Sequence, residues 1–171
     1  MSQNILNELS PDSLKSYIEF LMWHYKVIDA LWFLKTEENI GRSVAENLNT
    51  KVWEKAGALA AKDLVKRFNI TEKGITGFVK AQKLYPWAII IGYDFEQTED
   101  ELFINVKSCP SQEARKKHGL PEYACKEMHK SEFEAFAHII DPDICVRCVF
   151  APPDKRESGF YCRWHFYMKS K

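Results

Sequence analysis

The sequence predicts an α+β fold in which N-terminal helices pack on an antiparallel sheet built from two hairpins, with two short helices between the hairpins. Up to about residue 86, apolar residues recur at three- and four-residue steps, which is the period of amphipathic helices. Beyond that point, β-branched and aromatic runs alternate with polar turns, as in hairpins. Because helices and strands are clustered along the chain, an antiparallel sheet is favoured over a doubly wound one.

The helical part covers about residues 11–86. Ser10 can cap the first helix and Pro11 suits its first turn. The helix is expected to continue to the Glu37-Glu38 region and to stop near Gly41. Its apolar stripe consists of Leu14, Tyr17, Ile18, Leu21, Tyr25, Ile28 and Trp32.

Two more helices are expected before residue 87. Asn49 or Thr50 can cap the second helix. The third helix opens at Thr71-Glu72 and must end near Tyr85-Pro86, because a residue that precedes proline is pushed out of the helical region.

The sheet-containing part covers about residues 87–168. The first hairpin is expected to pair Trp87–Phe95 with Glu101–Val106, and the second to pair Ile144–Phe150 with Phe160–Met168. Between them, one short helix begins at Cys109-Pro110 and ends at Gly119, and another is capped by Ser131 and closed by Asp141-Pro142.

Length and composition indicate one globular domain, 1–171. The chain has 171 residues, of which 46% are apolar and 13% aromatic.

A formal net charge of zero argues against a nucleic acid or an anionic membrane as partner, because both require a concentrated positive field. The start MSQNILNELS lacks the features of a signal peptide, and no apolar run reaches the roughly 20 residues of a membrane span. A cytoplasmic protein is therefore expected.

Five cysteines in a reducing compartment are unlikely to form disulfides. Three of them lie in the second hairpin, within ICVRCVFAPPDKRESGFYC. Because side chains alternate along a strand, Cys145 and Cys148 are expected to point to opposite faces. If the connecting loop is symmetric about Lys155, Cys148 lies opposite Cys162 on the neighbouring strand.

The other two cysteines lie at the ends of elements. Cys109 precedes the proline that opens a helix, where the helix dipole lowers the pKa of a thiol. Cys125 lies in a loop between helices. One hypothesis is that Cys109, Cys125, Cys148 and Cys162 hold zinc or an iron–sulfur cluster through their thiolates. The alternatives are that some are merely packed thiols, or that Cys109 is a catalytic nucleophile.

Asp29 is the acidic residue that stands out in the first helix, since a run of apolar residues, Ala30 to Leu34, follows it. A buried carboxylate needs a partner or a raised pKa. Asp29 could orient a substrate or act as an acid or base, together with Glu37. Alternatively, it is a satisfied carboxylate that caps a break in the helix near Ala30.

Several segments resemble a known family when taken in order. They are DALWFLKTEENIG (29–41), VWEKAG (52–57), NVKSCP (105–110), HGLPEY (118–123), Cys125 and GFYCRWHF (159–166). In these segments the chain resembles the bacterial L-2-amino-thiazoline-4-carboxylate hydrolases and their uncharacterised relatives. The final strand also resembles, more distantly, the 4-vinyl reductase type of small-molecule-binding domain.

The resemblance implies a small α+β domain that hydrolyses a carbon–nitrogen or carbon–sulfur bond in a small amino-acid-like ring. The family pattern covers Asp29, Trp32, Glu37, Gly41, Cys109, Pro110, Cys125 and Cys162. Cys148 matches only the uncharacterised branch, and a fourth thiol favours a closed tetrahedral metal site.

The leading hypothesis is therefore a cytosolic protein with a four-cysteine metal or iron–sulfur centre beside a small-molecule pocket, with a role in sensing, transfer or redox chemistry. The second is a hydrolase of small cyclic amino-acid derivatives, which uses Cys109 or a metal-bound water together with Asp29 and Glu37. The third is a non-catalytic interaction domain. A small-molecule ligand is the expected partner, and homo-oligomerisation is left open.

Overall fold

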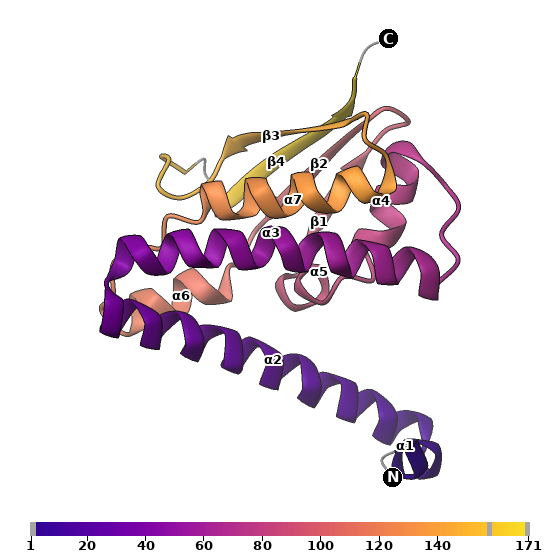
Figure 1. Ribbon diagram of the computed structural model, residues 1–171, viewed down its shortest axis with the longest axis horizontal. Coiled ribbons are helices and arrows are strands. Elements are labelled where there is room, and N and C mark those ends of the chain that lie inside the picture. Colours follow the sequence, from indigo (N-terminus) through magenta and orange to yellow (C-terminus); the bar gives the residue numbers. More distant parts are fainter. Residues whose placement is uncertain (1–2, 157–158, 170–171) are drawn as a thin grey trace.

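The computed structural model describes residues 3–156 and 159–169 and confirms the α+β fold. Its helices are α1 (Gln3–Glu8), α2 (Pro11–Ile40), α3 (Arg42–Arg67), α4 (Gly74–Gln82), α5 (Pro86–Ile91), α6 (Pro110–Lys117) and α7 (Lys126–Ile140). Its strands are β1 (Asp94–Gln97), β2 (Glu101–Val106), β3 (Ile144–Phe150) and β4 (Cys162–Met168). In Figure 1, α7 lies against the sheet, α3 lies next to α7, and α2 lies on the side of α3 away from the sheet.

The first long helix begins and ends where the sequence indicates. The Ser10 side chain accepts a hydrogen bond from the backbone N–H of Ser13, and Pro11 occupies the first turn of α2. Gly41, at φ 89°, separates α2 from α3, which starts at Arg42. The second helix therefore starts earlier than the expected caps at 49–50, because a single left-handed glycine is enough to reverse the chain.

Residues 86–91 are a helix, so the prediction of a strand from Trp87 to Phe95 is wrong over its first half. Pro86 takes the first helical position after an extended Tyr85, and Gly92 closes α5 in the left-handed conformation at φ 71°. These end signals outweigh the β propensity of the isoleucines between them. Only Asp94–Gln97 remains as the strand β1.

The four strands form one antiparallel sheet in the order β1-β2-β4-β3. The pairing of β3 with β4 is confirmed, but its predicted register is wrong: Cys148 lies opposite Trp164, and a bulge follows before Phe150. Cys162 instead pairs with Val106 on β2. In the loop between β3 and β4, Glu157 and Ser158 lie outside the described residues. A long loop fixes register weakly, which is why the sequence misplaced the pair.

The core lies between one face of the sheet and the helices α4 and α7. Phe78 of α4 packs on Phe166 of β4, with ring centroids 4.6 Å apart, and Phe133 of α7 packs on Trp164 at 5.3 Å. Along the same helix α7, Met128 and Glu132 face away from the sheet and line a cavity on the side of α2 and α3. Within residues 3–156 and 159–169, no helix is both long and apolar enough to cross a membrane.

Candidate functional site

A cavity of about 140 Å³ lies among α2, α3, α5, α7 and the segment 109–125. Most of its wall is apolar or aromatic, formed chiefly by Phe33, Trp53, Trp87, Ile91, Tyr93 and Tyr123. An apolar protein cavity of roughly 150 Å³ is large enough for benzene. The cavity can therefore hold a compact ring.

Glu132 is the most deeply buried charged residue of the cavity, with 2% of its surface exposed. Its Oε1 accepts a hydrogen bond from the Tyr85 hydroxyl at 2.6 Å, and its Oε2 lies 2.9 Å from Nδ1 of His129. Gly57 of α3 lets α7 approach closely, because a Cβ at this position would lie 3.0 Å from the backbone oxygen of Glu132. These contacts hold the carboxylate in one place.

Sequence reasoning missed Glu132, although one signal was available. Glu132 follows Met128 by four residues and precedes Phe136 by four, so it interrupts the buried stripe of α7. A carboxylate at such a position needs built-in partners. His129 and Tyr85 supply them, but Tyr85 belongs to a segment that only the tertiary structure brings close.

Asp29 lies on α2 and faces the same cavity as Glu132. Burial raises the pKa of Asp29 to about 6, and the nearby Glu132 carboxylate adds to this rise while His129 opposes it. The helix α2 is unbroken at Ala30, so the alternative that Asp29 caps a helix break is wrong. Asp29 is thus a partly buried carboxyl group that changes charge near neutral pH.

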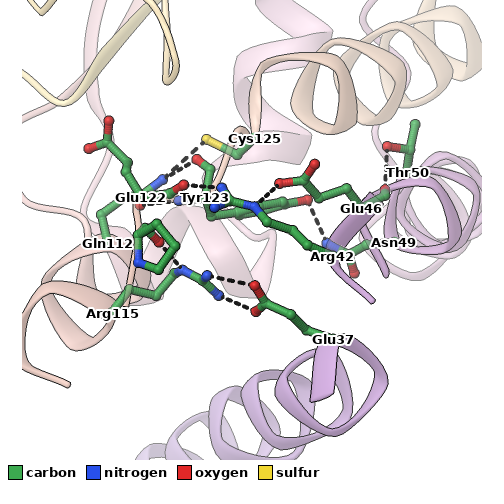
Figure 2. Close-up of polar contacts among 11 residues, drawn as sticks. Glu37, Arg42, Glu46, Asn49, Thr50, Gln112, Arg115, Glu122, Tyr123 and Cys125 are labelled. Atoms are coloured by element: carbon green, nitrogen blue, oxygen red, sulfur yellow. Dashed lines mark hydrogen bonds and ion pairs between the residues drawn. The ribbon is translucent and has the colours of Figure 1, made fainter. Parts of the chain in front are cut away.

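Glu37 has a different partner from the one expected. Figure 2 shows its carboxylate reaching both terminal nitrogens of Arg115, at 2.7 and 3.0 Å. The Arg115 side chain is only 7% exposed, and its hydrogen bonds lower the pKa of Glu37. Glu37 therefore fixes α6 to α2 at the edge of the cavity, and the carboxylate that influences Asp29 is that of Glu132.

The segment 118–125 is fastened over the cavity by side chains of α3 and α6 (Figure 2). The Gln112 amide donates to the backbone oxygen of Tyr123 at 2.7 Å and accepts from its N–H at 3.0 Å. Asn49 donates to the Tyr123 hydroxyl at 2.8 Å, and Arg115 Nε donates to the backbone oxygen of Pro121 at 2.7 Å. These bonds make one wall of the cavity a fixed part of the fold.

The four cysteines do not form the expected centre. Cys109 and Cys125 line the main cavity, and with Cys162 they border a second cavity of about 30 Å³, whereas Cys148 lines neither. Among the residues that the structure describes, no group of three or more His, Cys, Asp or Glu side chains could hold a metal ion. The hypothesis of a metal or iron–sulfur centre is therefore wrong, because the register of β3 places Cys148 against Trp164 instead of Cys162.

The thiols are also unlike a preformed set of thiolate ligands. Burial raises the pKa of Cys162 to about 12 and that of Cys148 to about 11, and it raises the pKa of Cys125 as well. Neutral thiols suit packing and are poor nucleophiles, since the reactive form is the thiolate.

Cys109 does precede the first turn of α6, as the sequence indicates. Burial nevertheless raises the pKa of its thiol, although the backbone N–H groups of Ser111 and Gln112 act in the opposite direction. The expected lowering by the helix dipole is therefore outweighed. The catalytic roles assigned to Cys109, Asp29 and Glu37 stay predictions.

The chain matches the model of a family of unknown function (DUF6125) over residues 7–168 and belongs to that family. No curated protein matches it.

Proposed function

We propose that this protein binds a small cyclic amino-acid-like molecule in the cavity between α2 and α7, with the basic nitrogen of the ligand beside Asp29 and Glu132. The observation that carries the proposal is a pair of carboxyl groups in a cavity whose walls are otherwise mainly apolar and aromatic. Ligand sites commonly combine apolar walls with a few fixed polar groups that orient the ligand.

The two carboxyl groups favour a cation. Glu132 raises the pKa of Asp29, which means that the negative charges of Asp29 and Glu132 repel each other across the cavity. Both oxygens of Glu132 are already held by Tyr85 and His129, so the carboxylate cannot turn away from this repulsion. A protonated nitrogen beside the pair would stabilise the ionised form of Asp29.

One cationic side chain in the same cavity favours a carboxylate on the ligand. Lys26 lines the cavity one helical turn before Asp29, on the same side of α2. A lysine ammonium supplies three donors and a positive charge, which suit a carboxylate of the ligand.

The resemblance to the thiazoline-carboxylate hydrolases supports the same class of ligand. The compound named there is a five-membered ring with an amino nitrogen and a carboxylate. A ring of this size matches a cavity of about 140 Å³.

The test measures binding of 2-amino-2-thiazoline-4-carboxylate by calorimetry and by thermal unfolding. Two matched probes each lack one group: 2-amino-2-thiazoline has no carboxylate, and cyclopentanecarboxylate has no nitrogen. We expect the complete compound to bind best. Asp29→Asn should weaken its binding about tenfold or more, since a hydrogen bond to a charged group is worth about 1.5–3 kcal/mol.

The control is Glu38→Gln, which removes an exposed carboxylate from the same helix and should leave binding unchanged. Binding should also weaken as the pH falls through about 6, because Asp29 then becomes neutral. The proposal is overturned if all three compounds bind equally well or if none of them binds. It is also overturned if Asp29→Asn binds the complete compound with wild-type affinity.

A further inference from the structure

Helix α2 has 30 residues, none of which is buried. It contacts the rest of the chain along one side of its C-terminal half, where the Tyr25 ring lies 5.8 Å from that of Trp87 and the Phe33 ring lies 4.8 Å from that of Tyr123. In Figure 1 its N-terminal half diverges from α3. Most of a long helix thus lies open, although its sequence is rich in large apolar residues.

The side of α2 opposite Asp29 carries a regular apolar seam, here called the outer seam. It consists of Tyr17, Phe20, His24, Val27, Leu31 and, at the edge of the cavity, Leu34. These residues follow each other at steps of three, four, three, four and three. This spacing is typical of a helix that packs along another helix.

In the middle of α2 the charges lie on the wrong side for a helix whose outer face meets water, whereas Lys35 and Glu38 near its C-terminus lie on the outer side. Between residues 16 and 34 the only charged residues are Glu19, Lys26 and Asp29. At about 100° per residue, all three fall within about 80° of Asp29, on the side away from the outer seam. A surface helix normally shows the reverse pattern, with its charges outward. The outer side of α2 is therefore built to be covered.

The aromatic side chains of this outer side pack on each other. The Phe20 and His24 rings are stacked with centroids 5.8 Å apart and an interplanar angle of 5°. The rings of Tyr17 and Trp23 lie 6.2 and 6.0 Å from that of Phe20. They nevertheless stay widely exposed, with 54% of Trp23 and 50% of Phe20 open. They form a contiguous apolar surface and not scattered exposed residues.

We infer that the outer seam of α2 packs antiparallel against the outer seam of a second copy of this chain and forms a two-fold symmetric homodimer. The spacing of the seam reads the same in both directions, so in an antiparallel pair Tyr17 meets Leu34, Phe20 meets Leu31, and His24 meets Val27 of the partner helix. A two-fold interface requires such self-complementarity. A formal net charge of zero gives two copies no overall repulsion.

The available area reaches the range of a small specific interface. Six large apolar residues on or beside the outer seam are between 40% and 54% exposed: Tyr17, Phe20, Leu21, Trp23, Ile28 and Leu31. With large side chains of roughly 150–250 Å² each, they offer roughly 400–700 Å² per partner, and an interface at the small end of the specific range buries roughly 600 Å² per partner. No charged side chain of the outer seam would have to be desolvated.

The divergent N-terminal half of α2 selects the antiparallel arrangement. Leu14, Ile18 and Leu21 of this half are 36–49% exposed. In an antiparallel pair, this half lies beside the C-terminal half of the partner's α2 and the start of its α3, where Val44 and Leu48 are 47% and 44% exposed. In a parallel pair, both N-terminal halves would project away from both bodies.

The mass of the full chain by light scattering after size exclusion tests the dimer. The chain has a mass of 20.0 kDa, so the expected value is twice that. The single variants Phe20→Lys and Leu31→Glu each bury two unpaired charges in the interface and should be monomeric. The control Ile139→Glu, at an exposed isoleucine of α7, should remain dimeric. Circular dichroism of each variant checks that its helices are kept.

The double variant Phe20→Lys/Leu31→Glu distinguishes the two arrangements. In the antiparallel pair each lysine meets a glutamate, so the double variant should dimerise at concentrations where both single variants are monomeric. In a parallel pair like charges would meet. A monomeric wild type, a dimeric Phe20→Lys variant or a monomeric double variant overturns the inference. A monomeric wild type that floats with uncharged phosphatidylcholine vesicles would assign the surface to lipid instead. None of these results depends on ligand binding in the cavity.

Discussion

The Tyr85 hydroxyl donates a 2.6 Å hydrogen bond to the Glu132 carboxylate inside the protein. Burial and the nearby carboxylate hold the pKa of Tyr85 far above its ordinary value, so the hydroxyl remains a donor over the whole accessible pH range. This bond joins the start of α5 to the middle of α7 and fixes the acidic end of the cavity.

Replacing Tyr85 by phenylalanine should therefore destabilise the fold. The change removes one hydrogen bond to a buried charged group, which is worth about 1.5–3 kcal/mol. The free energy of unfolding in urea measures the loss. Tyr17→Phe is the control, because that tyrosine is 40% exposed and should change stability very little. Equal stabilities of the two variants would contradict a structural role for the bond.

Glu37→Gln should also destabilise the fold, because it leaves the Arg115 guanidinium without its counter-charge. The arginine side chain is 7% exposed, and breaking a buried ion pair from one side costs about 3–5 kcal/mol. The adjacent Glu38 forms an ion pair with Lys35 whose side chains are 58% and 63% exposed. Glu38→Gln should cost about 0–1 kcal/mol. Denaturation of the two variants side by side checks the difference, and similar losses would refute it.

The pH dependence of stability should separate Asp29 from Glu37. The folded state raises the pKa of Asp29 from 3.8 to about 6, so the contribution of Asp29 is most favourable below 3.8 and is lost as the pH rises to about 6. The pKa of Glu37 is lowered by Arg115, so its contribution is present above 4.5 and is lost as the pH falls.

Melting temperatures measured across this range should therefore move in opposite directions. Relative to wild type, Asp29→Asn should become steadily more stable as the pH rises from 3.8 to about 6 and then level off. Glu37→Gln should lower the melting temperature most above pH 4.5 and less in acid. If the difference in melting temperature between Asp29→Asn and wild type did not change with pH, Asp29 would ionise in the fold as it does in the unfolded chain.

Local patterns predicted most of the elements, and long-range pairing accounts for most of the errors. Pro11 and Gly41 marked the ends of α2 correctly, since end signals act within one turn of the backbone. The register of Cys148 could not be predicted, because the loop before Cys162 is long enough to permit several pairings. The strand expected at 87–91 shows a second kind of error, in which β propensity was given more weight than Pro86 and Gly92.

The candidate site shows the same division. Asp29 and Cys109 were recognised from their neighbours in the sequence, and both line the cavity. Glu132 and Tyr85 were not recognised as site residues, because the bond between them spans 47 residues.

The sequence by itself determined most of the helices and strands, the apolar stripe of α2, and the partial burial of a carboxyl group at position 29. These follow from the chemistry of neighbouring residues and from the two backbone periods. Only the tertiary structure decided that Asp29 faces Glu132, that Glu37 belongs to Arg115, and that the four cysteines form no centre. Such pairings depend on strand register and helix approach, which are set by the packing of the whole core.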